Sequence, residues 1–188
     1  MKIRTIISYV MYSYIAKHLP KSKNSYTGFF ERIRAFFVRG YIDFCGECVN
    51  IQPLATIARR VSIGNFSGIG RNCLIQSGVC IGEHIMMGPE VYIYTQNHEF
   101  TRIDIPMDQQ GWSDEKPVVI EDDVWIGSRV TILGGVTIGR GSIIGASSVV
   151  TKSCPPYSIV AGNPAQVVKN LKSATIIQYT IKGRFMNR

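Results

Sequence analysis

The clearest pattern in the chain is an aliphatic residue at every sixth position through its middle. Fifteen positions, here called anchors, follow this spacing in two runs, and twelve of them are isoleucine. The first run is Cys45, Ile51, Ile57, Ile63, Ile69, Ile75, Ile81, Met87 and Ile93, and the second is Ile120, Ile126, Ile132, Ile138, Ile144 and Val150. A short fixed period predicts a solenoid of stacked repeats.

Two further regularities predict the structure of each six-residue unit. The residues two positions before the fourteen anchors from Ile51 onward are small or β-branched. Because positions two apart share one face of a strand, we expect both to point inward. Glycine follows eight of the fifteen anchors, so we expect a sharp turn there, where a Cβ would be costly. Each unit is then one short strand and one bend, and stacked units form parallel sheets around an isoleucine interior.

The spacing breaks once. From Ile93 to Ile120 is 27 residues, four units plus three, so the phase is lost. We therefore expect residues 96–117 to leave the wall as a loop, in agreement with their polar composition. A loop of this length in a compact domain is usually functional. His98 stands at its root and is a candidate for acid–base chemistry.

The first forty-four residues are expected to form a helical segment. An eleven-residue apolar run, Ile6 to Ala16, imitates a signal peptide, but no small-x-small cleavage site follows and the run is too short to span a bilayer. Helical spacing explains it better, because one stripe holds Ile3, Ile6, Ile7, Val10, Met11, Tyr14 and Ile15. Three alternatives stay open for this stripe: packing on the chain's own body, on a partner subunit, or weakly on a membrane surface.

Length, charge and cysteine content narrow the class of protein and its expected partners. The 188 residues fit one domain, and the net charge of +8 is concentrated near the two ends of the chain. No helix-turn-helix or stacking-aromatic signature accompanies it, so we expect no nucleic-acid partner. Five cysteines without a secreted-framework spacing predict reduced thiols and a cytoplasmic location. Cys45 and Cys48 form a C-x-x-C without further ligands at zinc spacing, so we expect no metal.

The repeat resembles the left-handed parallel β-helix of hexapeptide-repeat acyltransferases, an all-β solenoid in which three units form one triangular coil. The segments Val124–Ser128, Ile144–Lys152 and Gly162–Ala165 are similar to the galactoside, maltose and polysaccharide-biosynthesis sugar O-acetyltransferases. The resemblance covers about residues 45–172. It implies about five coils over residues 45–163, followed by a C-terminal helix and basic tail over residues 164–188.

The same resemblance implies the chemistry. A histidine at the root of the protruding loop, here His98, is the general base that lets a hydroxyl attack the thioester of acetyl-CoA directly. The donor lies between subunits of a homotrimer. Position by position, Trp125 and Ser128 flank its reactive end, Ala146 meets the pantetheine arm, and Thr151, Lys152 and Lys169 lie towards the nucleotide and phosphates. Gln166 departs from the pattern, since relatives often carry a basic residue there.

Alternatives stay open for the acceptor and for the class of activity. A sugar hydroxyl of a polysaccharide or its precursor is expected, and serine or an antibiotic is the alternative acceptor within the superfamily. A non-catalytic β-helix scaffold is the alternative from another class. The γ-class carbonic anhydrases share the fold, but their second and third metal-binding histidines have no counterpart after His98. His84 is expected to lie on an outward corner as a surface residue.

Overall fold

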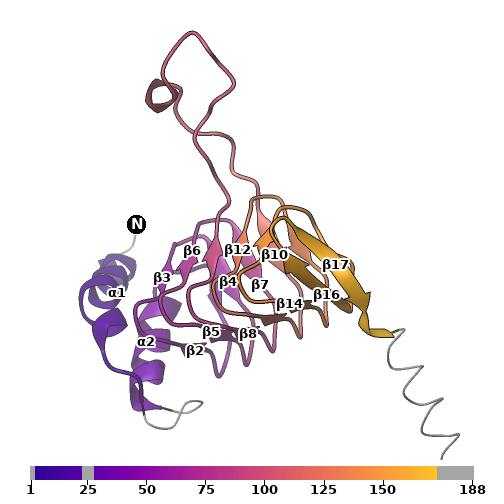
Figure 1. Cartoon of the computed structure of the whole chain (residues 1–188). Helices are drawn as coiled ribbons and strands as arrows, with labels where there is room; N and C mark the ends of the chain where they lie inside the picture. The colour runs from indigo at the N-terminus through magenta and orange to yellow at the C-terminus, as the bar shows by residue number, and fades with distance from the viewer. Residues whose placement is uncertain (1–2, 23–27, 173–188) are drawn as a thin grey trace, which may run out of the picture.

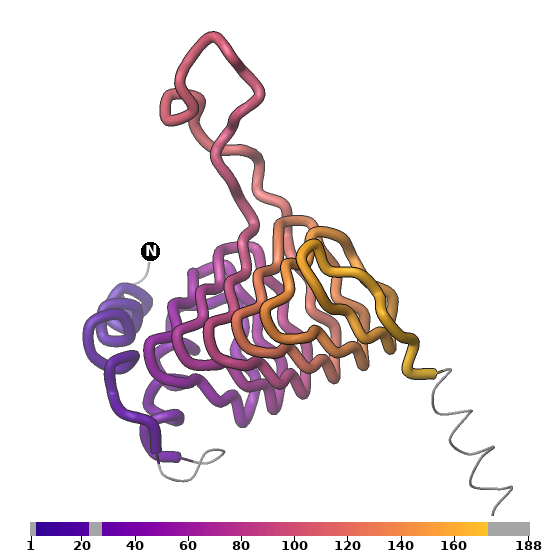
Figure 2. The backbone as a smooth tube through the Cα atoms, viewed as in Figure 1, coloured from indigo at the N-terminus to yellow at the C-terminus, as the bar shows by residue number. Residues whose placement is uncertain are grey.

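The computed structural model describes residues 3–22 and 28–172 of the chain. Two helices, α1 (Ile3–Tyr14) and α2 (Phe29–Arg39), and the short 3₁₀ helix η1 (Ala16–His18) lie at one end of a long triangular prism, and one arm projects from its side (Figure 1). The coils follow one another along the prism from the N-terminal to the C-terminal end (Figure 2). Among the described residues no helix is long and apolar enough to cross a membrane.

Three sheets form the sides of the prism, here called sides A, B and C in chain order. Side A contains β1 (Phe44–Cys45), β4 (Val61–Ile63), β7 (Val79–Ile81), β10 (Val118–Ile120) and β13 (Thr137–Ile138). Side B contains β2 (Asn50–Ile51), β5 (Gly68–Ile69), β8 (Met86–Met87), β11 (Trp125–Ile126), β14 (Ile143–Ile144), β16 (Ser158–Gly162) and β17 (Ala165–Asn170). Side C contains β3 (Thr56–Ile57), β6 (Leu74–Ile75), β9 (Tyr92–Ile93), β12 (Thr131–Ile132) and β15 (Val149–Val150).

The six-residue period places every anchor at the end of a strand from β1 to β15. All the anchors except the half-buried Cys45 are in the buried core, and so are the residues two positions before them. Strands of successive coils pair in parallel with anchor beside anchor, as Ile126 pairs with Ile144. The predicted left-handed parallel β-helix is therefore confirmed, with isoleucine columns as its interior.

The glycines after the anchors serve close packing rather than a sharp turn, which corrects the predicted reason. The left-handed backbone conformation occurs three residues after an anchor instead, as at Phe66, Asn72 and His84. A Cβ on Gly70 would lie 1.9 Å from the carbonyl oxygen of Gly88 in the next coil. Glycine is needed there because the corners of successive coils touch through their backbones.

The coil count and the C-terminal element also differ from expectation. After five coils, Cys154 bridges to Ile138 and β16 pairs with β14, so the chain forms two sides of a sixth turn. Residues Ala165–Asn170 then form β17, antiparallel to β16, where the helix was expected to begin at residue 164. The free edge of β16 offers unpaired backbone groups, and an extra strand satisfies them. Residues 173–188, which carry the rest of that prediction, lie outside the described residues.

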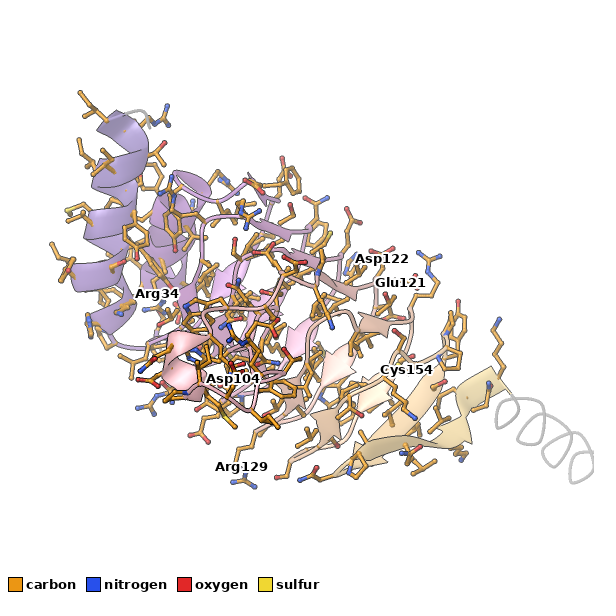
Figure 3. The ribbon with its side chains drawn as sticks, turned by 90° about the horizontal axis from the view of Figure 1, so that it is seen from above. Arg34, Asp104, Glu121, Asp122, Arg129 and Cys154 are labelled. Atoms are coloured by element: carbon orange, nitrogen blue, oxygen red, sulfur yellow. The ribbon has the colours of Figure 1, made fainter. Side chains whose placement is uncertain are left out.

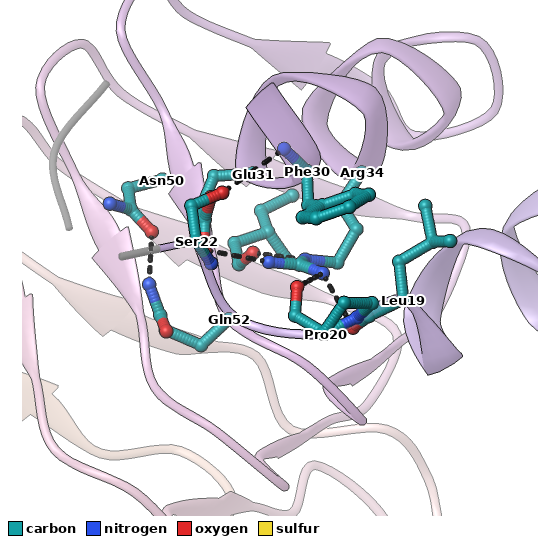
Figure 4. Close-up of polar contacts among 9 residues, drawn as sticks. Leu19, Pro20, Ser22, Phe30, Glu31, Arg34, Asn50 and Gln52 are labelled. Atoms are coloured by element: carbon teal, nitrogen blue, oxygen red, sulfur yellow. Dashed lines mark hydrogen bonds and ion pairs between the residues drawn. The ribbon is translucent and has the colours of Figure 1, made fainter. Parts of the chain in front are cut away.

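A buried arginine fixes the N-terminal helices to the prism (Figure 4). The Arg34 guanidinium donates to the carbonyl oxygens of Ile51 (2.5 Å) and Leu19 (3.0 Å) and pairs with the Glu31 carboxylate at 2.9 Å. Both charged side chains are almost fully buried. One guanidinium therefore connects α2, the segment after η1 and the first coil.

The predicted apolar stripe of α1 does not face the prism. The side of α1 that packs inward carries the buried Tyr12, whose hydroxyl donates to the Ala55 carbonyl at 2.7 Å. The stripe residues Ile3, Ile6, Ile7, Val10 and Tyr14 are all exposed. Of the three alternatives for this stripe, packing on the chain's own body is therefore wrong.

Candidate active site

The arm leaves the prism where the phase of the repeat is lost, at the edge between sides C and A. Its two limbs run antiparallel from Thr95 to Lys116, with the short helix η2 (Met107–Gln109) in the outer part (Figures 1 and 2). The Lys116 N–H donates to the Thr95 carbonyl at 2.7 Å, and the Thr95 N–H donates to the Gln76 side chain at 2.8 Å. The root of the arm is thus tied to the coil before it.

His98 lies in the first limb of this hairpin and is exposed. Backbone hydrogen bonds close the hairpin on both sides of it, from Ser113 N–H to the Asn97 carbonyl (2.9 Å) and from Glu99 N–H to the Gly111 carbonyl (3.1 Å). The predicted loop therefore holds His98 in a regular hairpin stem. Its imidazole is open to a second molecule.

Trp112 is a site residue that the sequence did not reveal. It lies opposite His98 across the hairpin, and the two rings stack with centroids 3.9 Å apart and an interplanar angle of 29°. The indole is 60% exposed, so the hydrophobic core does not require it. Trp112 lies opposite His98 only because the arm is a two-stranded hairpin with this register. The six-residue repeat stops before the arm, so it could not predict which residues of the two limbs pair.

Two of the predicted donor residues lie at another edge, between sides B and C. Ser128 follows β11 and Ala146 follows β14, one coil further on. The corners stack closely, since the Ser147 N–H donates to the Ser128 carbonyl at 2.8 Å and a Cβ on Gly127 would lie 2.6 Å from the Ala146 nitrogen. Small side chains leave this edge open, with Ala146 exposed.

Trp125 and Lys169 point outward from side B itself. Strand register aligns Trp125 with Ile143, Ile143 with Ile159, and Ile159 with Lys169. Three strand spacings separate the indole from the lysine, roughly 14 Å. Beside Trp125, a hollow of about 260 Å³ opens on side B and includes Gly68, where no side chain fills the face.

Thr151 and Lys152 lie on the edge that carries the arm. They follow β15 at the turn from side C to side A, and both are exposed. The structure therefore does not bring the seven predicted site residues together within one chain. His98, Thr151 and Lys152 share one edge, whereas Ser128 and Ala146 share another.

The two edges are separated by the width of side C. Seen from above, along the arm, Asp104 of the arm lies over the prism (Figure 3). Asp122, at the edge between sides A and B, lies towards one side of the view, and Arg129, at the edge between sides B and C, lies towards the other. A base on one edge cannot serve a thioester held at another edge of the same chain, because proton transfer needs contact at hydrogen-bond distance. A site that uses both edges must be completed by a second copy.

The other cysteine and histidine residues singled out in the sequence lie in the wall and at its corners. Cys45, Cys48 and Cys73 are free thiols, and burial raises the pKa of Cys73 to about 11, so this thiol stays protonated. His84 is exposed as expected and stacks on Phe66. In the described ranges no three His, Cys, Asp or Glu side chains are placed to hold a metal ion.

Comparison with known proteins agrees with this fold. The family pattern described as "Bacterial transferase hexapeptide (six repeats)" matches residues 117–152. A putative acetyltransferase of Saccharomyces cerevisiae is 34% identical over 79% of this chain and 78% of its own length. A putative acetyltransferase of Schizosaccharomyces pombe is 40% identical over 50% of this chain. The chain spans only 44% of that relative.

Solved structures of acetyltransferases are similar in fold to most of this chain. A hexapeptide-repeat acetyltransferase of Vibrio cholerae, solved with acetyl coenzyme A, is 30% identical with a TM-score of 0.71 over 88% of each chain. A maltose O-acetyltransferase of Clostridium difficile is 28% identical with a TM-score of 0.70, over 89% of this chain and 86% of its own. A galactoside acetyltransferase in complex with coenzyme A is 25% identical with a TM-score of 0.71, over 92% and 83%.

Proposed function

The chain belongs to the hexapeptide-repeat acetyltransferases, and we propose that it transfers an acetyl group from acetyl-CoA to a sugar hydroxyl with His98 as general base. The observation that carries this proposal is the exposed imidazole of His98, held in the hairpin stem at an edge of the prism and stacked on Trp112. Histidine suits the step because its reference pKa of roughly 6.5 allows it to take and return a proton near neutral pH.

The proposed reaction needs no covalent enzyme intermediate. His98 accepts the hydroxyl proton as the acceptor oxygen bonds to the thioester carbonyl carbon. The carbon–sulfur bond then breaks, and the imidazolium returns the proton to the leaving thiolate, giving the acetyl ester and CoA. Backbone N–H groups are the natural donors for the oxyanion of the tetrahedral intermediate.

Trp112 is the proposed positioning residue for this base. An imidazole on a hairpin arm has free rotation about its side-chain bonds, and each lost rotamer costs free energy when substrate binds. Ring stacking at 3.9 Å limits that rotation before the acceptor arrives. The charged imidazolium formed during the reaction also gains from an aromatic face beside it.

The donor is proposed to lie along the B–C edge and side B. The open corner at Ala146 admits the pantetheine arm, and Trp125 and Ser128 flank the thioester. Lys169, on the same outward face as Trp125, suits the anionic nucleotide end, and Thr151 and Lys152 are the further candidates for that end.

A homotrimer is the proposed assembly. The base edge and the donor edge lie apart within one chain, and in a ring each copy can present its arm to the donor edge of the next.

The proposed acceptor class is a polysaccharide or its precursor. Five free thiols, Cys45, Cys48, Cys73, Cys80 and Cys154, support a reducing, cytoplasmic location.

The test is acetyl-CoA consumption with a panel of sugars, serine and chloramphenicol. The loss of thioester absorbance is the readout, because the chain's own thiols do not contribute to it. We expect turnover with a sugar, the same rate after exhaustive chelation, and loss of turnover in His98→Ala. His84→Ala is the matched control, since it removes another exposed, ring-stacked histidine. Turnover that requires a metal, or that survives in His98→Ala, would contradict the proposal.

A further inference from the structure

The helix α1 lies at the N-terminal end of the prism (Figure 1) and presents an apolar stripe to solvent. The exposed fractions are 76% for Ile3, 41% for Ile6, 55% for Ile7, 43% for Val10 and 76% for Tyr14. These positions recur at intervals of three and four residues and therefore form one continuous stripe. Side chains project from this outer side of α1, away from the prism (Figure 3).

The orientation of α1 is fixed by contacts on its other side. The Tyr12 hydroxyl donates to the Ala55 carbonyl, and its ring packs 5.8 Å from the ring of Tyr41. Tyr9 makes an edge contact with the same ring at 5.3 Å. Rotating the helix to bury the isoleucines would break these contacts and expose Tyr12. The outward direction of the stripe is therefore part of the fold.

The N-terminal segment that carries the stripe is basic. Between residues 3 and 42, outside the gap at 23–27, the exposed or half-buried charged side chains are all basic: Arg4, Lys17, Lys21, Arg32 and Arg39. The acidic side chain of this segment is Glu31, which is buried and paired with Arg34. None of Arg4, Lys17, Lys21 and Arg32 is in an ion pair in the described part of the chain. An apolar stripe on a basic segment complements an anionic surface.

We infer that α1 docks the protein on the surface of a membrane that contains anionic lipids. A helix of 12 residues cannot span a bilayer, but it can lie in the interface with its apolar stripe among the upper acyl chains. The basic side chains of the same N-terminal segment, Arg4 of α1 among them, then attract the anionic headgroups. A two-fold pairing of α1 with the α1 of a second copy fits less well, because it would bring the same basic side chains together.

Three copies would strengthen this docking. In a ring of copies that contact one another through the sides of their prisms, all the N-terminal ends lie on one face of the assembly. Three stripes then engage one surface at once, so that weak single contacts combine. The gain from several copies rests on the proposed trimer, whereas docking by the stripe of a single chain does not depend on it.

The test is vesicle co-sedimentation of the full chain, with phosphatidylcholine alone and with phosphatidylcholine mixed with phosphatidylglycerol. We expect binding to the mixed vesicles that weakens with added salt. The double variant Ile7→Gln/Val10→Gln keeps helix-forming residues and should lower the partition by about tenfold or more. Lys17→Gln/Lys21→Gln should weaken binding to the mixed vesicles and leave the weak binding to neutral vesicles unchanged.

Phe66→Asn is the matched control, because it removes an exposed apolar side chain from another corner, and its backbone φ of 57° suits asparagine. Circular dichroism and the melting temperature show that each variant is folded. Equal vesicle binding by Ile7→Gln/Val10→Gln and the wild type would overturn the inference. An assembly that halves in mass in this variant, with no vesicle binding by the wild type, would show a second copy on α1 and would also overturn it.

Discussion

In the prism wall, aliphatic residues recur at every sixth position and all the anchors but Cys45 are buried, whereas no residue of the arm between 96 and 117 is in the core. The wall needs its side chains for packing, and most of them cannot change without changing the stack. The arm is held by a few backbone hydrogen bonds and one ring stack. Stability is therefore expected to depend on the wall, and the proton-transfer step on the arm. Substitutions in the two regions should separate these properties.

The largest effect is expected in the arm. His98→Ala removes the proposed base and should lower kcat by about 10² to 10⁴. The melting temperature should stay unchanged, because the imidazole is exposed and outside the core. Steady-state kinetics and a thermal melt of the same sample measure both. A His98→Ala variant that is unfolded, rather than folded and inactive, would contradict the expectation that His98 does not contribute to stability.

The matching change in the wall is Ile132→Ala. This side chain is fully buried in the column of side C, so its truncation should cost about 2–5 kcal/mol in the free energy of unfolding. Urea unfolding at a fixed protein concentration measures it. Ile103→Ala, at a fully exposed position in the arm, is the control and should change stability by less than about 0.5 kcal/mol. Equal effects at both positions would contradict the assignment of stability to the wall.

Gly70→Ala tests the contact between coils. The added Cβ would meet the Gly88 carbonyl, and the separation of two backbones must increase. We expect a loss of about 1–3 kcal/mol in the free energy of unfolding. Gly111→Ala in the arm has open space but a φ of 84°, so it tests conformational strain without a clash. Retained stability in Gly70→Ala would contradict close packing between coils as the reason for glycine at this corner.

The smallest effect is expected for Trp112→Ala, about tenfold in kcat with KM for acetyl-CoA unchanged. Stacking positions the base without touching the donor, so KM for acetyl-CoA should not respond, and the melting temperature should stay unchanged because the indole is exposed. Trp112→Phe keeps an aromatic face and should restore most of the rate. If Trp112→Phe fails as badly as Trp112→Ala, the indole acts through something other than the stack.

Much of the wall could be predicted from sequence because each of its features repeats. The anchors, the inward companions and the place of the arm all follow from one period and its single interruption. The C-terminal strand β17 could not be predicted, because its place depends on the free edge that β16 leaves. The stack of Trp112 on His98 depends on hairpin register, and the period ends before it.

The N-terminal helix shows a different limit. Its helical stripe was predicted correctly, but the direction of the stripe depends on which side of the helix meets the first coil. Tyr12 determines this through a hydroxyl that reaches the Ala55 carbonyl, a contact between segments 43 positions apart. A pattern along one helix shows that it has an apolar side. It does not show what lies beside it.

The central claim is that the base comes from the arm of one copy and the donor edge from another. It is tested by mixing two inactive variants, His98→Ala and Ala146→Trp, in which the indole fills the open corner proposed for pantetheine. Co-expressed chains with separable tags should form mixed trimers that regain about one third of the wild-type rate, because one of the three junctions in such a ring pairs two intact edges. Mixed assemblies that stay as inactive as the two parents would contradict the claim.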